Sequence, residues 1–143
     1  FYTLARSIIG QQISVKAAQA VWDRFENKIK KVTPTNAANM HFMSMKSCGL
    51  SKQKISYLKS LSDAFLKKKI NPKKWGRLTD EEIISELVTI GGVGRWTAVM
   101  FLIFYLCRPD IFPADDLGVI SGICNCYDLN FPIDKGTATI MSA

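Results

Sequence analysis

Three glycines and a pair of aspartates have the residue types and the spacing that chemistry would need in this chain. Gly91, Gly92 and Gly94 lie in the phrase LVTIGGVGRWTA, and glycine permits the positive φ angles and close backbone approach of a tight turn. A helix that begins directly after such a turn presents backbone N–H groups and its positive dipole end to an anion such as phosphate. Downstream, Asp115 and Asp116 supply carboxylates that can stabilise positive charge or orient a water molecule.

Both features also have an ordinary structural interpretation. A glycine-rich turn can be a tight connection between two helices, and an aspartate ahead of a helix can be its N-cap. Taken together, they favour a protein that binds a nucleic-acid backbone and does acid chemistry on it. The carbonyl oxygens of the turn could also hold a monovalent cation, which would add positive charge beside the phosphate.

The charge balance of the chain supports a polyanionic partner. The 143 residues include 19 Lys and Arg against 12 Asp and Glu, which gives a formal net charge of +7. Such a balance favours nucleic acid or an anionic membrane surface, although it also fits a merely soluble basic protein. Hydrophobic residues make up 48% of the chain, enough for a core. No apolar run reaches the roughly 18 residues of a membrane-spanning helix, and we expect no membrane association.

Apolar periodicity and capping residues predict an all-α chain, in which strand signals are weak throughout. Gly10 ends a first helix over 2–9, and Ser14 caps a second, whose apolar face begins at Val15. Thr79 and Glu82 form a capping box at the start of another helix. The remaining helices are expected over about 37–45, 54–65 and 95–106, with a last one directly after Asp116.

The cysteines and the single histidine are expected to be structural. The spacing of Cys48, Cys107, Cys124 and Cys126 matches neither a common zinc ligand set nor a four-cysteine iron–sulfur loop. Free, mostly buried thiols in a reducing compartment are therefore expected. His41 lies in the apolar run NMHFMSM, which favours a partly buried structural side chain.

Three phrases in the same order resemble a known family of DNA repair enzymes. LVTIGGVGRWTA is similar to the helix-hairpin-helix of DNA glycosylases, in the superfamily named for that hairpin and for the Gly/Pro-rich loop and aspartate that follow it. FPADDLGVISG matches the loop-and-aspartate half, and SIIGQQIS and GLSKQKISYL also match. The combination of GRWTA, PADDLG and GQQIS most resembles the 3-methyladenine DNA glycosylase II branch. The resemblance covers nearly the whole chain, which we expect to be trimmed at both ends.

The resemblance implies two helical lobes with the active-site cleft between them. Residues 1–106 would form a helical bundle that ends in the helix-hairpin-helix at 87–106. Residues 107–143 would carry the aspartate loop and the start of a second lobe, which is expected to be incomplete.

In that family the catalytic aspartate enters the helix after the loop, which falls on Asp116. Asp115 would then be a cap or an acceptor behind it. Cleavage of an N-glycosidic bond develops positive charge on the sugar, which a fixed carboxylate stabilises. Strand-cutting relatives carry a lysine where this chain has Trp96, so the resemblance implies hydrolysis without strand cleavage. Trp96 would either face the base pocket or pack in the core.

The same resemblance implies a set of DNA contacts around the hairpin. Gly92 and Gly94 would hold a phosphate. The separate turn between the first two helices would enter the minor groove through Gln11 and Gln12. Some relatives have leucine in place of Gln12. The alternative for Gln11 and Gln12 is a solvated turn between helices. The alternative for the segment that begins near Ser51 is an ordinary capped helix with no DNA contact. The remaining expected DNA contacts are Arg95, Thr97, Ser51 and Lys54. The matching cation ligands are the carbonyls of Val88, Ile90 and Val93.

The sequence therefore predicts a monomeric glycosylase that flips alkylated purines of the 3-methyladenine type from duplex DNA and hydrolyses them. It would require no cofactor beyond a structural Na⁺ or K⁺ at the hairpin. It would work in the bacterial cytoplasm, at the nucleoid, or in a eukaryotic nucleus. The alternative is a non-catalytic helix-hairpin-helix module that only binds DNA, with Asp116 as a simple N-cap.

Overall fold

The computed structural model describes residues 1–141, which are helical and contain no strand. This confirms the all-α prediction. The chain divides into two compact units, Phe1–Ala98 and a second that begins at Val99. The boundary lies inside a helix, whereas the sequence placed it after residue 106. The predicted division and the predicted cleft between lobes stay predictions.

The first unit contains six α-helices and a 3₁₀ helix before the boundary helix begins. Their bounds are α1 (Tyr2–Gly10), α2 (Val15–Ile29), α3 (Pro34–Asn39), α4 (Phe42–Ser47), α5 (Lys52–Leu66), η1 (Pro72–Arg77) and α6 (Asp80–Val88). The boundary helix is α7 (Arg95–Phe104), and the second unit contains α8 (Leu117–Cys126) and α9 (Lys135–Met141).

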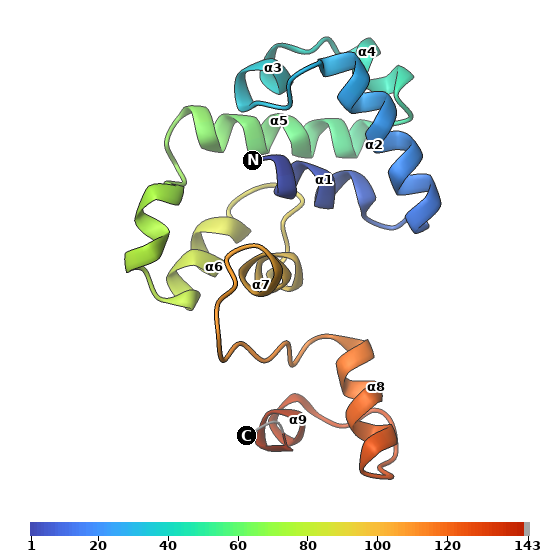
Figure 1. Cartoon of the computed structure of the whole chain (residues 1–143), viewed down its shortest axis with the longest axis vertical. Helices are drawn as coiled ribbons and strands as arrows, with labels where there is room; N and C mark the ends of the chain where they lie inside the picture. The colour runs from blue at the N-terminus through green and yellow to red at the C-terminus, as the bar shows by residue number, and fades with distance from the viewer. Residues whose placement is uncertain (142–143) are drawn as a thin grey trace. The chain divides into compact units, whose positions relative to one another are not determined.

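Helix α5 is the centre of the first unit, where it contacts α1, α3 and α4 (Figure 1). Its buried side chains recur every three or four residues, at Ile55, Leu58 and Leu61, which is the spacing of one helix face. Trp22 and Phe25 from α2 are also fully buried in this unit. The core therefore fixes α5, which carries Tyr57 and Ser60 against the hairpin.

Cationic side chains close the C-terminal ends of the short helices. The Lys54 ammonium donates to the Ile9 carbonyl at 2.7 Å, and the Lys59 ammonium donates to the Met40 carbonyl at 2.7 Å. The last carbonyls of a helix carry its negative dipole end and lack partners within the helix. Partial burial lowers the pKa of both ammonium groups below that of a free lysine.

The second unit is smaller. Helices α8 and α9 contact each other, and Ile120, Cys124 and Ala138 are buried. No helix among residues 1–141 has both the length and the apolar character that crossing a bilayer requires.

Several local predictions were wrong. The helix expected over 37–45 is two helices, because the backbone is extended at Met40 and His41. His41 was predicted to be a partly buried structural side chain, but it is exposed. It is the N-cap of α4, where its Nδ1 accepts a hydrogen bond from the Met43 N–H at 3.2 Å. Val15, expected on a buried face, is 88% exposed in the first turn of α2.

The cysteines and the C-terminal helix also differ from expectation. All four cysteines are free thiols, as predicted, but Cys107 and Cys126 are exposed and only Cys48 and Cys124 are buried. Burial raises the pKa of the Cys48 thiol. Helix α9 and the 3₁₀ helix η1 were not among the predicted helices.

Candidate nucleic-acid interface and catalytic carboxylate

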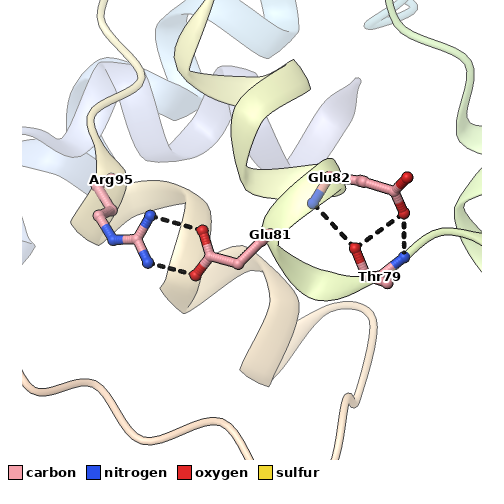
Figure 2. Close-up of polar contacts among 4 residues, drawn as sticks. All are labelled: Thr79, Glu81, Glu82 and Arg95. Carbon is pink, nitrogen blue, oxygen red and sulfur yellow. Dashed lines mark hydrogen bonds and ion pairs between the residues drawn. The ribbon is translucent and has the colours of Figure 1, made fainter.

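The first helix of the hairpin, α6, begins with the predicted capping box. The Thr79 hydroxyl accepts a hydrogen bond from the Glu82 N–H at 3.3 Å, and the Glu82 carboxylate accepts one from the Thr79 N–H at 2.7 Å (Figure 2). These contacts hold the pKa of the Glu82 carboxyl below its usual value. The helix start is therefore fixed by two reciprocal bonds, as the spacing of the two residues predicted.

The hairpin turn is anchored by apolar side chains and closed by backbone hydrogen bonds. Ile90 and Val93 are 2% and 4% exposed, and the Val93 N–H donates to the Ile90 carbonyl at 3.0 Å. The Gly94 carbonyl accepts from the Ala98 N–H at 3.0 Å. The second helix thus begins at Arg95, directly after the turn, as the sequence predicted.

Gly92 and Gly94 serve different purposes. Gly92 has a φ of +86°, and a Cβ there would lie 2.3 Å from a ring carbon of Tyr57. No residue with a side chain fits this position without moving the tyrosine. A Cβ at Gly94 would meet nothing within 4 Å, so the space ahead of α7 is open to a ligand.

Two long-range hydrogen bonds hold the hairpin tip. The Gln11 amide donates to the Gly92 carbonyl at 2.8 Å, and the Gly91 N–H donates to the Ser60 hydroxyl at 3.1 Å. Gln11 therefore joins the turn after α1 to the hairpin. It was predicted as a DNA contact, and the structure gives its amide nitrogen this positioning role.

A cavity of about 470 Å³ brings several of the predicted DNA contacts together within the first unit, but not Arg95 or Thr97. Gln11, Gln12, Ser51 and Lys54 line it together with the hairpin residues Val88 to Gly94. No acidic side chain is among its lining residues, so its groups are neutral polar groups, backbone and one ammonium. Such a lining suits an anion.

The turn after α1 presents Gln12 at the edge of this cavity. Gln12 has a φ of +58°, is exposed and lines the cavity, while its neighbour Ile13 is 40% exposed. A non-glycine residue with positive φ is uncommon and needs support from its surroundings. The position is compatible with the predicted insertion into a groove, which stays a prediction.

The first turn of α7 places its predicted residues in three different environments. The Arg95 guanidinium makes two hydrogen bonds with the Glu81 carboxylate (Figure 2), which hold the pKa of Glu81 below its usual value. Thr97 is 7% exposed, so its side chain is buried. Trp96 is 49% exposed, which excludes the core interpretation, and its place in a base pocket stays a prediction.

The three carbonyls assigned to a monovalent cation belong to residues that line the same cavity. Val88 is the last residue of α6, where the negative end of the helix dipole favours a cation. Neutral carbonyl oxygens are suitable donors for such an ion. The Ile90 carbonyl also accepts the Val93 N–H and retains a second lone pair. The donor set therefore fits Na⁺ or K⁺.

In the second unit, the two aspartates have distinct roles. Asp116 is the N-cap of α8, where its Oδ1 accepts from the Gly118 N–H at 2.8 Å and the Val119 N–H at 3.0 Å. Asp115 forms an ion pair with Lys135 of α9. The cap is therefore Asp116, and the expectation that Asp115 might serve as one was wrong.

Four residues with clear roles were missed in the sequence. Tyr57 and Ser60 lie three apart on α5, a spacing that puts both on one helix face, but nothing local indicated that this face meets the hairpin. Glu81 and Lys135 each form an ion pair. Their partners lie 14 and 20 residues away, beyond the reach of a helical-spacing argument.

Comparison with known proteins agrees with these features. Residues 5–139 match the model of the HhH-GPD superfamily of base excision DNA repair proteins. The chain is 42% identical over 123 residues to DNA-3-methyladenine glycosylase 1 of Schizosaccharomyces pombe, covering 83% of this chain and 54% of that protein. It is 39% identical to DNA-3-methyladenine glycosylase of Saccharomyces cerevisiae, covering 85% of this chain and 45% of that protein.

A solved structure gives the same result. The 3-methyladenine DNA glycosylase of S. pombe, in complex with abasic DNA, superposes with a TM-score of 0.81 at 38% identity, covering 97% of this chain and 69% of that one. The chain spans about half the length of the curated relatives it matches. Its family model covers nearly all of it, and the chain belongs to the HhH-GPD superfamily of base excision DNA repair proteins.

Proposed function

We propose that the chain is part of a DNA glycosylase that hydrolyses the N-glycosidic bond of alkylated purines of the 3-methyladenine type in duplex DNA. The observation that carries this proposal is the match to relatives named as 3-methyladenine glycosylases, with Asp116 where the family motif has its aspartate. The two amide bonds to its carboxylate are those of an N-cap and fit the non-catalytic module as well. Asp116 stands in the loop motif of a family to which the chain belongs. Relatives at 42% and 39% identity are named as 3-methyladenine glycosylases.

The hairpin would hold the DNA backbone. A Cβ at Gly94 would meet nothing within 4 Å, and a phosphate bound there would gain hydrogen bonds from the first N–H groups of α7 and the favourable dipole end of the helix. Ser51 and Lys54 would supply further polar groups from α5. A bound Na⁺ or K⁺ on the carbonyls of Val88, Ile90 and Val93 would add positive charge beside that phosphate.

The chemical step would use one carboxylate. As the bond to an alkylated base breaks, the sugar develops oxocarbenium character. Asp116 would stabilise that charge or orient the attacking water. Its two amide hydrogen bonds fix the carboxylate before the reaction begins, which is what electrostatic stabilisation requires. An alkylated purine is already cationic, so it leaves without a second acid.

The replacement of the strand-cutting lysine by Trp96 supports a monofunctional enzyme. An indole cannot form a Schiff base with the sugar, whereas a lysine amine can. Half exposed, Trp96 offers a face on which a flipped cationic base would stack. We infer a monomer that acts on genomic duplex DNA, at the nucleoid of a bacterium or in a eukaryotic nucleus.

Base release from duplexes that each carry one defined lesion tests this proposal. We expect the purified protein to release 3-methyladenine and to leave the strand intact until alkali is added. Borohydride should trap no covalent adduct. An adduct would show that a lysine elsewhere in the chain forms a Schiff base. Binding without release of any alkylated base would favour the non-catalytic module.

A further inference from the structure

The segment between α5 and α6 carries cations that the proposed function does not use. Residues 67–77 hold six cationic side chains in eleven positions, and all are exposed; they are Lys67, Lys68, Lys69, Lys73, Lys74 and Arg77. We call this segment the basic ridge. Lys67 pairs with Asp63 at 2.6 Å. For the other five, the described part of the chain shows no ion pair.

The basic ridge is anchored and is not a loose tail. Ile70 and Trp75 lie between its cations and are 2% and 4% exposed. The Trp75 indole N–H donates to the Glu86 carboxylate at 2.8 Å, and the Asn71 side chain accepts from the Lys73 N–H at 3.2 Å. A fixed backbone presents the cations at defined positions, so the entropic cost of ordering them on a ligand is smaller.

A second cavity lies between one end of the basic ridge and the hairpin cavity. Lys69 lines it together with Lys59, Asp63 and Thr89, and Thr89 also lines the hairpin cavity. The two cavities therefore follow one another along α5, and in Figure 1 the chain passes from the end of α5 into the ridge. The 15 residues of α5 span about 22 Å at 1.5 Å per residue.

Three glutamates line a further cavity together with Lys69 of the basic ridge, and each has a hydrogen-bond partner elsewhere. Glu81 binds Arg95, and Glu82 binds Thr79. Glu86 accepts the indole N–H of Trp75. None of the three forms an ion pair with a ridge lysine among the described residues.

We propose that the basic ridge is a second binding surface for the DNA duplex, which contacts backbone phosphates to one side of the hairpin contact. The inference rests on the proposed function. A span of about 22 Å corresponds to roughly six base pairs at 3.4 Å each. The ridge contacts would be independent of sequence, because ammonium groups bind phosphates and do not read bases.

A matched pair of charge variants tests the inference. The ridge variant is K68Q/K73Q/K74Q, and the control is K30Q/K31Q/K46Q, which removes three exposed lysines from the α2–α4 region. Each set includes one lysine with positive φ, +53° for Lys68 and +63° for Lys30, so the backbone cost is matched. DNA affinity is measured as a function of salt concentration for two duplexes, each with the lesion at its centre. The duplex of about 10 base pairs lacks the flanking phosphates, and the duplex of about 30 base pairs includes them.

The ridge variant should bind the long duplex more weakly and the short duplex as the wild type does. For the long duplex, the slope of log K against log[salt] should become shallower by about 0.9 for each phosphate that the ridge variant no longer neutralises. The control should keep the wild-type slope. Equal slopes for ridge variant and wild type on the long duplex would overturn the inference, as would an equal weakening in the control or on the short duplex. Failure of the wild-type protein to bind either duplex would instead refute the proposed function, and the inference with it.

Discussion

Gly92→Ala should destabilise the hairpin far more than Gly94→Ala. The alanine at 92 must adopt a φ of +86°, which costs an L-residue about 1–2 kcal/mol. Its Cβ would also lie 2.3 to 2.9 Å from three side-chain atoms of Tyr57, well inside the contact distance of roughly 3.5–4.0 Å. Overpacking of that kind adds about 1–3 kcal/mol. The sum is about 2–5 kcal/mol.

The matched control has neither penalty. Gly94→Ala meets no atom within 4 Å, and its cost is that of replacing glycine ahead of a helix, about 1 kcal/mol or less. Urea denaturation monitored by circular dichroism gives both free energies of unfolding. Against a total stability of about 5–15 kcal/mol, the first change is a large fraction and the second is not.

A double mutant separates the two terms at position 92. Tyr57→Ala removes the two ring atoms that the new Cβ would meet and keeps the Tyr57 Cβ at 2.9 Å. Adding it to Gly92→Ala should therefore recover most of the overpacking part and leave the backbone part. A coupling energy of about 1–3 kcal/mol is therefore expected between the two changes. Equal stability of Gly92→Ala and wild type would refute the reasoning, and so would strict additivity of the two substitutions.

Three further outcomes follow from contacts around the hairpin. Gln11→Ala leaves the hairpin carbonyl without its donor and should cost about 1–3 kcal/mol by urea denaturation. The pKa of Glu82 is lower in the folded protein than in the unfolded chain. The stabilisation from its carboxylate is therefore complete above the unfolded pKa and disappears as pH falls through the lower folded pKa. Glu82→Gln should make the free energy of unfolding fall less steeply as the pH is lowered through this range. Glu81→Gln releases Arg95 from an exposed ion pair that adds little stability, and DNA affinity in a titration should rise roughly two- to fivefold.

The features that the sequence predicted well are local ones. The capping box of Thr79 and Glu82 depends on residues three apart, and the helix start after Gly94 depends on a glycine-rich turn. Both are set by backbone geometry that a short stretch of chain determines. The hairpin and the aspartate at the start of α8 were found for this reason, and the family resemblance joined them into one candidate site.

What the sequence could not predict depends on tertiary contact. The Gln11 amide and the Gly92 carbonyl are 81 residues apart, and Ser60 is 31 residues from Gly91. No periodicity indicates such pairs. His41 was predicted to be partly buried because it lies in an apolar run, whereas the run contains a helix start that the imidazole caps. Val15 has the helical spacing of a core residue, yet its place in the first turn of α2 leaves it exposed.

In the proposed reaction the Asp116 carboxylate carries the chemical step. Asn caps a helix about as well as Asp, so Asp116→Asn should fold, and it should bind lesion-containing duplex with nearly wild-type affinity. Single-turnover release of 3-methyladenine should fall by roughly 10²- to 10⁴-fold. Asp115→Asn, which removes only the ion pair with Lys135, should release the base at close to the wild-type rate. Wild-type release by Asp116→Asn would contradict the account.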